Sequence, residues 1–336
     1  MKALLSVRVG GPETLVLRDI ADPVPGAGEV LIAVKACGLN YPDQLIIQDK
    51  YQFKPTRPFS PGGEVAGVVE ALGDGVSDFC VGDRVIGSVT WGGLAQKLAL
   101  PATGCVKIPS SMPFDEAAAF LLSYVTSYHA LKHRAAIAPG ETLLVLGAGG
   151  GVGLAAVELG RAFGARVIGA ASSSEKLKIA EEAGAHKVLM YPRDAAAPDI
   201  RRQIASDFKS AAEPSGIDVV YDCVGGSYTE SALRALNIEG RLLIVGFPAG
   251  IASIPMNLPL LKACQIVGVF AGDWMHRKQD QYRAAVKDLI TMYRNGQIRP
   301  RISARFPLSD APRGLMSLVE RTALGKLVVL MDDQPG

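Results

Sequence analysis

The chain has 336 residues, of which 49% are hydrophobic and 20% are charged, so it is long enough for about two globular domains and too apolar for a disordered protein. Its formal net charge of +2 gives no electrostatic reason to expect nucleic-acid binding, and small, weakly polar ligands fit this charge better. The five cysteines are widely spread and form no Cys-x-x-Cys pair, which argues against a disulfide framework and against a cysteine zinc site.

The amino-terminal residues predict a first strand and a turn rather than a signal peptide, because Arg8 interrupts the apolar run early. The longest uncharged stretch, 142–157, is shorter than the roughly 20 apolar residues of a membrane span. We therefore expect no membrane association and a cytoplasmic protein.

Short apolar segments separated by glycine and proline fill the chain up to about residue 122, among them 29–35, 63–70 and 82–87. This pattern is typical of a β domain. From 117 to 131 the pattern becomes helical.

Alternating strand and helix patterns follow from residue 142 to about residue 270 and predict an α/β domain. The predicted helices begin after residues 150, 174, 198 and 228. The predicted strands, which suffice for a doubly wound parallel sheet, are 142–146, 166–171, 187–190, 218–221, 241–246 and 265–269.

Two amphipathic segments, 279–295 and 309–324, are each followed by a glycine and predict helices. The last apolar segment, 326–331, predicts a strand. We expect this strand to return to the first domain, because the α/β sheet already has its full set of strands.

Five glycines between residues 147 and 153 separate a predicted strand from a predicted helix. Glycines let the backbone approach a pyrophosphate, and the helix that follows offers free N–H groups and its positive dipole end. Gly147, Gly150 and Gly153 recur every third residue, which departs from the common G-x-G-x-x-G spacing. The two strands predicted next nevertheless favour a Rossmann-type dinucleotide site over a structural loop.

The residues after the second strand of this unit favour NADP(H) over NAD(H). NAD sites usually place an acidic residue there, about 20 residues past the glycines. Here Ser172, Ser173 and Ser174 end the strand and Lys176 follows, and these hydroxyls, the cation and the helix N-terminus attract a 2′-phosphate. Ser172 with Glu175 also fits a capping box, and the two roles are compatible.

Several fragments resemble the medium-chain dehydrogenase/reductase superfamily and, within it, the zinc-free quinone oxidoreductases related to zeta-crystallin. The resemblance covers essentially the whole chain and rests on segments 25–32, 36–43, 61–69, 81–85, 126–131, 147–153, 219–226 and 325–329. It implies a GroES-like, β-rich catalytic domain of residues 1–122 and 273–336 and a Rossmann domain of residues 123–272. It also implies an active site in the cleft between these domains and a homodimer or homotetramer.

The chain departs from the zinc alcohol dehydrogenases of this superfamily at the metal positions. Asn40-Tyr41 stand where those enzymes have Cys-His, and Gly63 replaces the histidine of Gly-His-Glu. None of the four histidines lies at metal-ligand spacing with a cysteine, so we expect no catalytic zinc. Without this Lewis acid, hydride transfer from NADPH to a quinone or an α,β-unsaturated carbonyl is favoured over alcohol oxidation, because such acceptors need little acid catalysis.

The resemblance further implies roles for particular residues. Asn40 would lie near the nicotinamide ribose and the substrate carbonyl, Thr126 near the nicotinamide, and Tyr51 in the substrate pocket as a hydrogen-bond donor. The other expected cofactor contacts are Gly150, Gly151 and Val152 at the pyrophosphate, Ser172, Lys176 and Tyr191 at the 2′-phosphate, and Gly246, Phe247, Phe270 and Gly272 at the nicotinamide end, with Arg321 approaching from the C-terminal part. Simpler roles stay open for four of them: a turn for Asn40, a surface aromatic for Tyr51, strand-end packing for Tyr191 and a solvated helix arginine for Arg321.

Two other functions remain as alternatives to a quinone or enone reductase. One is a reductase of α,β-unsaturated acyl thioesters, which would need a longer cleft and basic residues. The other is a non-catalytic NADPH-binding protein of the crystallin type or an RNA-binding protein, which the near-neutral charge disfavours.

Overall fold

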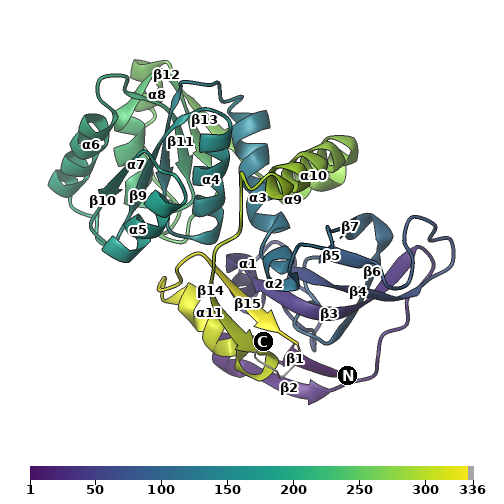
Figure 1. Cartoon of the computed structure of the whole chain (residues 1–336). Helices are drawn as coiled ribbons and strands as arrows, with labels where there is room; N and C mark the ends of the chain where they lie inside the picture. The colour runs from purple at the N-terminus through teal and green to yellow at the C-terminus, as the bar shows by residue number, and fades with distance from the viewer. Residues whose placement is uncertain (332–336) are drawn as a thin grey trace. The chain divides into compact units, whose positions relative to one another are not determined.

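The computed structural model describes residues 1–331 and divides into two units, each described by itself (Figure 1). Unit 1 comprises residues 1–122 together with the described residues from Pro300 onward, and unit 2 comprises Ser123–Arg299. The compact units thus divide after Leu122 and before Pro300, whereas the domain bounds expected from the sequence are 122 and 273. The two helices after residue 270, α9 (Ala271–Arg277) and α10 (Gln279–Arg294), pack within unit 2.

Unit 1 is built on a largely antiparallel sheet in the order β14-β15-β3-β4-β5-β7, with β6 also paired to β3. A separate antiparallel pair, β1 with β2, completes its strands. The strands are β1 (Lys2–Ser6), β2 (Leu15–Asp19), β3 (Glu29–Leu39), β4 (Glu64–Leu72), β5 (Arg84–Ser88), β6 (Lys97–Pro101), β7 (Cys105–Lys107), β14 (Ile302–Pro307) and β15 (Lys326–Leu330). The expected return of the last strand is confirmed, because β15 pairs antiparallel with β3.

The helices of unit 1 are short and lie against this sheet. They are α1 (Tyr41–Ile46), α2 (Phe114–Ala118) and α11 (Ala311–Val319), with 3-10 turns at Pro12–Thr14, Ala102–Gly104 and Leu308–Asp310. Helix α11 ends five residues before the predicted limit of 324, because Arg321 adopts a left-handed φ of 58° that a helix does not continue through. The buried faces of α1 and α11 join the strands in one apolar core.

Unit 2 contains a six-stranded, fully parallel sheet in the order β10-β9-β8-β11-β12-β13. This is the strand order of a doubly wound dinucleotide-binding fold. Its strands are β8 (Thr142–Leu146), β9 (Arg166–Ala171), β10 (Lys187–Met190), β11 (Ile217–Asp222), β12 (Leu236–Ile244) and β13 (Gln265–Gly268). All six predicted strands are present, and every residue of the central strand β8 is buried, as expected for a strand with helices on both faces.

Helices alternate with these strands (Figure 1). They are α3 (Leu121–Tyr128), which continues as a π-helix over His129–Arg134, then α4 (Gly151–Ala162), α5 (Ser174–Glu182), α6 (Pro198–Ala212), α7 (Ser227–Ala235), α8 (Asn257–Lys262), α9 and α10. Among the described residues, none of the helices combines the length and the apolar character needed to cross a membrane.

Candidate functional site

The glycine turn lies after β8, where the carboxyl ends of the parallel strands meet at one edge of the sheet. Gly147 has a φ of 74°, and the N–H groups of Gly147 and Ala148 both donate to Ala170 O, at 2.9 and 3.1 Å. A Cβ on Gly153 would lie 2.1 Å from Gly147 O, so only glycine allows α4 to approach the turn this closely. The irregular glycine spacing therefore has a packing reason.

The N-terminus of α4 presents backbone donors at this turn. The first hydrogen bond of the helix runs from Leu154 N to Gly150 O at 2.8 Å, so the N–H groups of Gly151 and Val152 precede the helical ladder. Around Gly150 a Cβ would meet one atom within 4 Å, Gly147 O at 3.6 Å, which leaves room for a ligand to approach. These donors and this space fit a pyrophosphate.

Ser172 directly follows the neighbouring strand, β9, and Lys176 lies in the first turn of α5, beside the glycine turn. A Cβ on Gly149 would fall 2.5 Å from Cβ of Lys176, so the stem of Lys176 runs directly along the glycine turn. The helix cap differs from the expected one: Ser173, not Ser172, caps α5, and its hydroxyl accepts from Lys176 N at 3.4 Å. Ser172 is thus not used as the cap and is half-buried at the strand end.

Tyr191, at the end of β10, is buried, and its ring packs on Tyr228 with 4.7 Å between centroids. Burial raises the pKa of Tyr191, and the backbone of Gly147 at the glycine turn acts in the opposite direction. The buried ring therefore packs beside the glycine turn, which agrees with the packing alternative.

Asp222, at the end of β11, was not singled out as a site residue. It is buried, and its carboxylate accepts hydrogen bonds from Val224 N and Gly225 N at 2.9 Å and from Thr229 Oγ1 at 2.6 Å. Burial raises the pKa of Asp222. An acid that ends an apolar strand and precedes a Gly-Gly pair is the signal that could have identified this anchor of the loop.

The ends of β12 and β13 carry the residues expected at the nicotinamide. Gly246 N donates to Asp222 O at 3.3 Å, which ties the end of β12 to the end of β11. Phe247 and Phe270 are 51% and 52% exposed, and Gly272 is half-buried in the first turn of α9. Along the sheet from β10 to β13, the residues predicted to contact the 2′-phosphate come first, those for the pyrophosphate next and those for the nicotinamide last.

Thr126 is half-buried on α3, and its neighbour Ser127 fixes that helix to the cofactor-binding elements. Ser127 Oγ donates to Val152 O at 3.0 Å and lies 2.9 Å from the hydroxyl of the fully buried Tyr221. This link holds Thr126 next to the start of α4.

Unit 1 contains a buried polar cluster around Asn40, formed with Lys326 and Glu64. Lys326 Nζ donates to Asn40 Oδ1 at 2.6 Å and lies 3.4 Å from Glu64 Oε2, and these side chains are 5% and 1% exposed. Asn40 Nδ2 donates to Gly38 O at 3.2 Å and to Glu64 Oε2 at 3.5 Å, while Leu122 N donates to Glu64 Oε1 at 2.9 Å. The lysine therefore fixes the orientation of the Asn40 amide.

Sequence reasoning missed Lys326 and Glu64 as site residues. The available signal was a charged residue at the first position of a mainly apolar strand in both cases, in Lys326–Leu330 and in Glu64–Leu72. Burial raises the pKa of Glu64, and Lys326 acts in the opposite direction.

Asp43 lies in the first turn of α1, next to this cluster, and accepts a hydrogen bond from Asn40 N at 2.7 Å. It is buried, and burial raises its pKa to about 7, against the lowering effect of the hydrogen bond from Asn40. The structure thus gives Asp43 the local structural role that α1 needs at its N-terminus.

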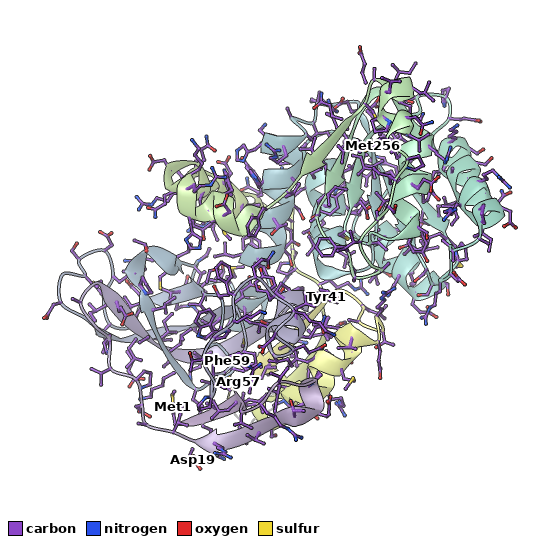
Figure 2. All side chains as sticks on the ribbon, turned by 180° about the vertical axis from the view of Figure 1, so that it is seen from behind. Met1, Asp19, Tyr41, Arg57, Phe59 and Met256 are labelled. Atoms are coloured by element: carbon purple, nitrogen blue, oxygen red, sulfur yellow. The ribbon has the colours of Figure 1, made fainter. Side chains whose placement is uncertain are left out.

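Tyr51 is half-buried against the core of unit 1, within electrostatic range of Asp43. The loop that carries it is held by Arg57, whose guanidinium donates to Ile47 O at 2.9 Å and pairs with Asp49 at 2.8 Å. Arg57 also lies over the ring of Phe59, 5.4 Å from its centroid (Figure 2 labels both residues). Unit 1 therefore places Tyr51 within electrostatic range of Asp43, which accepts from Asn40 N, whereas Arg321 is exposed in the turn after α11.

The buried cluster of Asn40, Lys326 and Glu64 lies at the positions compared with the metal ligands of zinc dehydrogenases: Asn40 stands at one of them, and Glu64 follows Gly63. Across residues 1–331, no group of three or more histidine, cysteine, aspartate or glutamate side chains is arranged to hold a metal ion.

Two protein families match the chain: the alcohol dehydrogenase GroES-like domain over residues 26–110 and the zinc-binding dehydrogenase family over residues 151–291. The quinone oxidoreductase-like protein 2 homolog of Nematostella vectensis is 39% identical over 310 residues, which cover 90% of this chain and 82% of that protein. The human quinone oxidoreductase is 35% identical over 334 residues, or 98% of each chain. The chain belongs to the quinone oxidoreductase branch of the medium-chain dehydrogenase/reductase superfamily.

A solved quinone oxidoreductase of Thermus thermophilus, described with its NADPH complex, superposes with a TM-score of 0.81 at 33% identity, covering 98% of this chain and 100% of that one. The predicted family is therefore confirmed, and so is the fold class, a GroES-like domain with a Rossmann-type parallel-sheet domain. As a member of this branch, the chain is an oxidoreductase.

Proposed function

We propose that this oxidoreductase uses NADPH to reduce a quinone or an α,β-unsaturated carbonyl, without a catalytic metal. The observation that carries the proposal is the end of β9, where Ser172 and Lys176 lie beside the glycine turn and no acidic residue ends the strand. A 2′-phosphate fits hydroxyls and a cation, and quinone oxidoreductases solved with NADPH share this fold.

The residues of unit 2 would hold the cofactor at successive strand ends. The N–H groups of Gly151 and Val152 suit the pyrophosphate, and Gly150, whose own N–H donates to Gly147 O at 3.0 Å, leaves room for it to approach. Ser172 and Lys176 suit the 2′-phosphate, and the loops at Gly246, Phe247, Phe270 and Gly272 suit the nicotinamide end. Tyr191 packs beside the turn, and Thr126 is positioned through the hydrogen bonds of Ser127. Bound NADPH would supply a hydride, and the acceptor would complete its reduction with a proton from solvent.

Asn40 and Tyr51 are the proposed substrate-side residues. Lys326 turns Asn40 Oδ1 inward, so the amide nitrogen is the end that offers a donor to a carbonyl or a ribose hydroxyl. A ligand at this nitrogen would replace only the long contact of 3.5 Å to Glu64. Tyr51 would act as a second donor, and Arg321 is retained as a proposed cofactor contact.

The cofactor is tested by titration with NADPH and NADH. The acceptor is tested by following the reduced-nicotinamide absorbance with 1,4-benzoquinone, 9,10-phenanthrenequinone, 2-alkenals and an α,β-unsaturated acyl thioester. We expect tighter binding of NADPH and turnover of quinones or alkenals. Turnover of acyl thioesters alone would favour the thioester reductase, and NADPH binding with no turnover would favour the non-catalytic alternative. A stoichiometric zinc content that activity requires would contradict the metal-free proposal.

We also propose that the chain forms a homodimer through the free edge of β13. This strand ends the sheet of unit 2, and the segment leading into it carries exposed apolar side chains at Ile251, Met256, Leu260, Leu261 and Ile266 (Figure 2 labels Met256). A second copy related by a two-fold axis would pair its own β13 antiparallel and cover both apolar surfaces at once. Light scattering should give a dimer, and the Leu260→Glu variant a monomer, while Val24→Lys, at an exposed valine of unit 1, should leave the mass unchanged.

If light scattering gives a homotetramer, the chain must have a second interface besides β13.

The cytoplasmic location stays a prediction. Fractionation of cells that express the chain would test it.

A further inference from the structure

A cavity of about 410 Å³ in unit 2 lies between the π-helical continuation of α3, the end of β13 and α9, elements that lie side by side in Figure 1. This volume is within the range of small-molecule binding sites. Of the residues that line it, only Phe270 belongs to the expected cofactor contacts.

The inner wall of the cavity is aromatic. His129 and Trp274, both buried, stack with 4.3 Å between ring centroids and 18° between planes. His133 lies at the side, with its Nδ1 3.3 Å from Nδ1 of His129. Burial and the neighbouring His133 and Arg134 lower the pKa of His129 to about 4, so this wall is uncharged at neutral pH.

Residues His129–Arg134 form a π-helix, and its rings at positions 129 and 133 lie one turn apart, with 5.5 Å between their centroids. Single π-helical turns occur frequently at functional sites.

The rim of the cavity is cationic. Arg277 pairs with Asp273 at 2.5 Å, which neutralises both. Arg134 is anchored by a hydrogen bond from its Nε to Gly268 O at 3.0 Å and, like Lys278, forms no ion pair within residues 1–331. Two uncompensated positive charges thus face an aromatic wall and the half-exposed ring of Phe270.

We propose that this cavity binds a small aromatic carboxylate, whose carboxylate contacts Arg134 and Lys278 and whose ring lies against the wall at Trp274, away from Phe270. An aromatic ring matches the apolar wall, and a guanidinium paired with an ammonium selects an anion. The site shares Phe270 with the proposed cofactor contacts and uses none of the other residues proposed for the reductase activity.

Binding is measured by tryptophan fluorescence in a Trp91→Phe background, because the chain has two tryptophans and Trp274 is then the only reporter. The probes are sodium benzoate and its neutral isostere benzamide, each titrated with and without saturating NADPH. We expect a saturable change with benzoate, at least about tenfold weaker binding of benzamide, and no effect of NADPH on the benzoate affinity.

The variants Arg134→Gln and Lys278→Gln should each weaken benzoate binding about tenfold. Lys287→Gln, at an exposed lysine of α10, is the matched control and should leave the affinity unchanged. Melting temperatures equal to the parent's show that the variants are folded. Absence of saturation, equal binding of benzamide, unchanged affinity in both cavity variants, or displacement of benzoate by NADPH would each overturn the proposal.

Discussion

Lys326→Met tests whether the buried lysine holds the Asn40 cluster together. The variant keeps the apolar stem but leaves the carboxylate of Glu64, 1% exposed, without the ammonium that lies 3.4 Å from it. At an effective dielectric constant of about 20, two unit charges at this distance attract by about 5 kcal/mol. Breaking buried ion pairs by removing one partner destabilises proteins by about 3 to 5 kcal/mol, which is the loss we expect in the free energy of unfolding.

The pH dependence of this loss has a definite sign. Burial already raises the pKa of Glu64, and removal of Lys326 raises it further. A carboxyl whose pKa is higher in the folded than in the unfolded state loses stability as the pH rises above its unfolded value. The difference between parent and variant should therefore be larger at about pH 8 than at about pH 5.

Urea unfolding followed by circular dichroism at both pH values measures these differences. Glu64→Gln in the Lys326→Met background should recover much of the loss, because glutamine keeps the acceptor for Leu122 N without the charge. Lys54→Met, at an exposed lysine of the same unit, is the control. A loss below about 1 kcal/mol, as found for exposed pairs, or a double variant no more stable than the single one, would refute the reasoning.

Three further predictions concern the cofactor turn and Asp43. Lys176→Ala should weaken NADPH binding about tenfold and change NADH binding little. Lys178→Ala, on the same helix, is the control. An equal loss of affinity for both cofactors would argue against a contact between Lys176 and the 2′-phosphate. Gly153→Ala places a Cβ 2.1 Å from a backbone oxygen and should lower both the melting temperature and NADPH affinity, whereas Gly268→Ala, with no atom within 4 Å, should leave the melting temperature unchanged. Because burial raises the pKa of Asp43 to about 7, the free energy of unfolding should fall as the pH rises from about 4 to about 7. If the free energy of unfolding of Asp43→Asn depends on pH as steeply as that of the parent, another group is responsible.

The sequence was informative wherever function depends on local pattern. The strand, glycine turn and helix at 142–162 follow from an apolar run, five glycines and helical spacing, and the structure places them as expected. The location of the serines and the lysine at the end of β9 could likewise be predicted from the sequence. The length of one strand-helix-strand unit sets the distance from the glycines to the end of the second strand.

The sequence was less informative where the outcome depends on packing between distant segments. The compact units divide at 300, whereas the expected domain bound is 273, because α9 and α10 pack within unit 2. Helix amphipathicity shows that a face is buried, but it does not say against which unit. The choice of Ser173 over Ser172 as the helix cap depends on one residue of register, which capping motifs leave open.

The sequence by itself determined the two-domain plan, the dinucleotide turn and the absence of the zinc-ligand pairs, because each is written in residues close together along the chain. Only the tertiary structure revealed the cluster of Asn40, Glu64 and Lys326, since the lysine lies 286 positions from the asparagine and reaches it through the pairing of β15 with β3. The same holds for the cavity at His129 and Trp274. A buried charge finds its partner through the sheet register and the packing of the core, and no local pattern encodes that pairing.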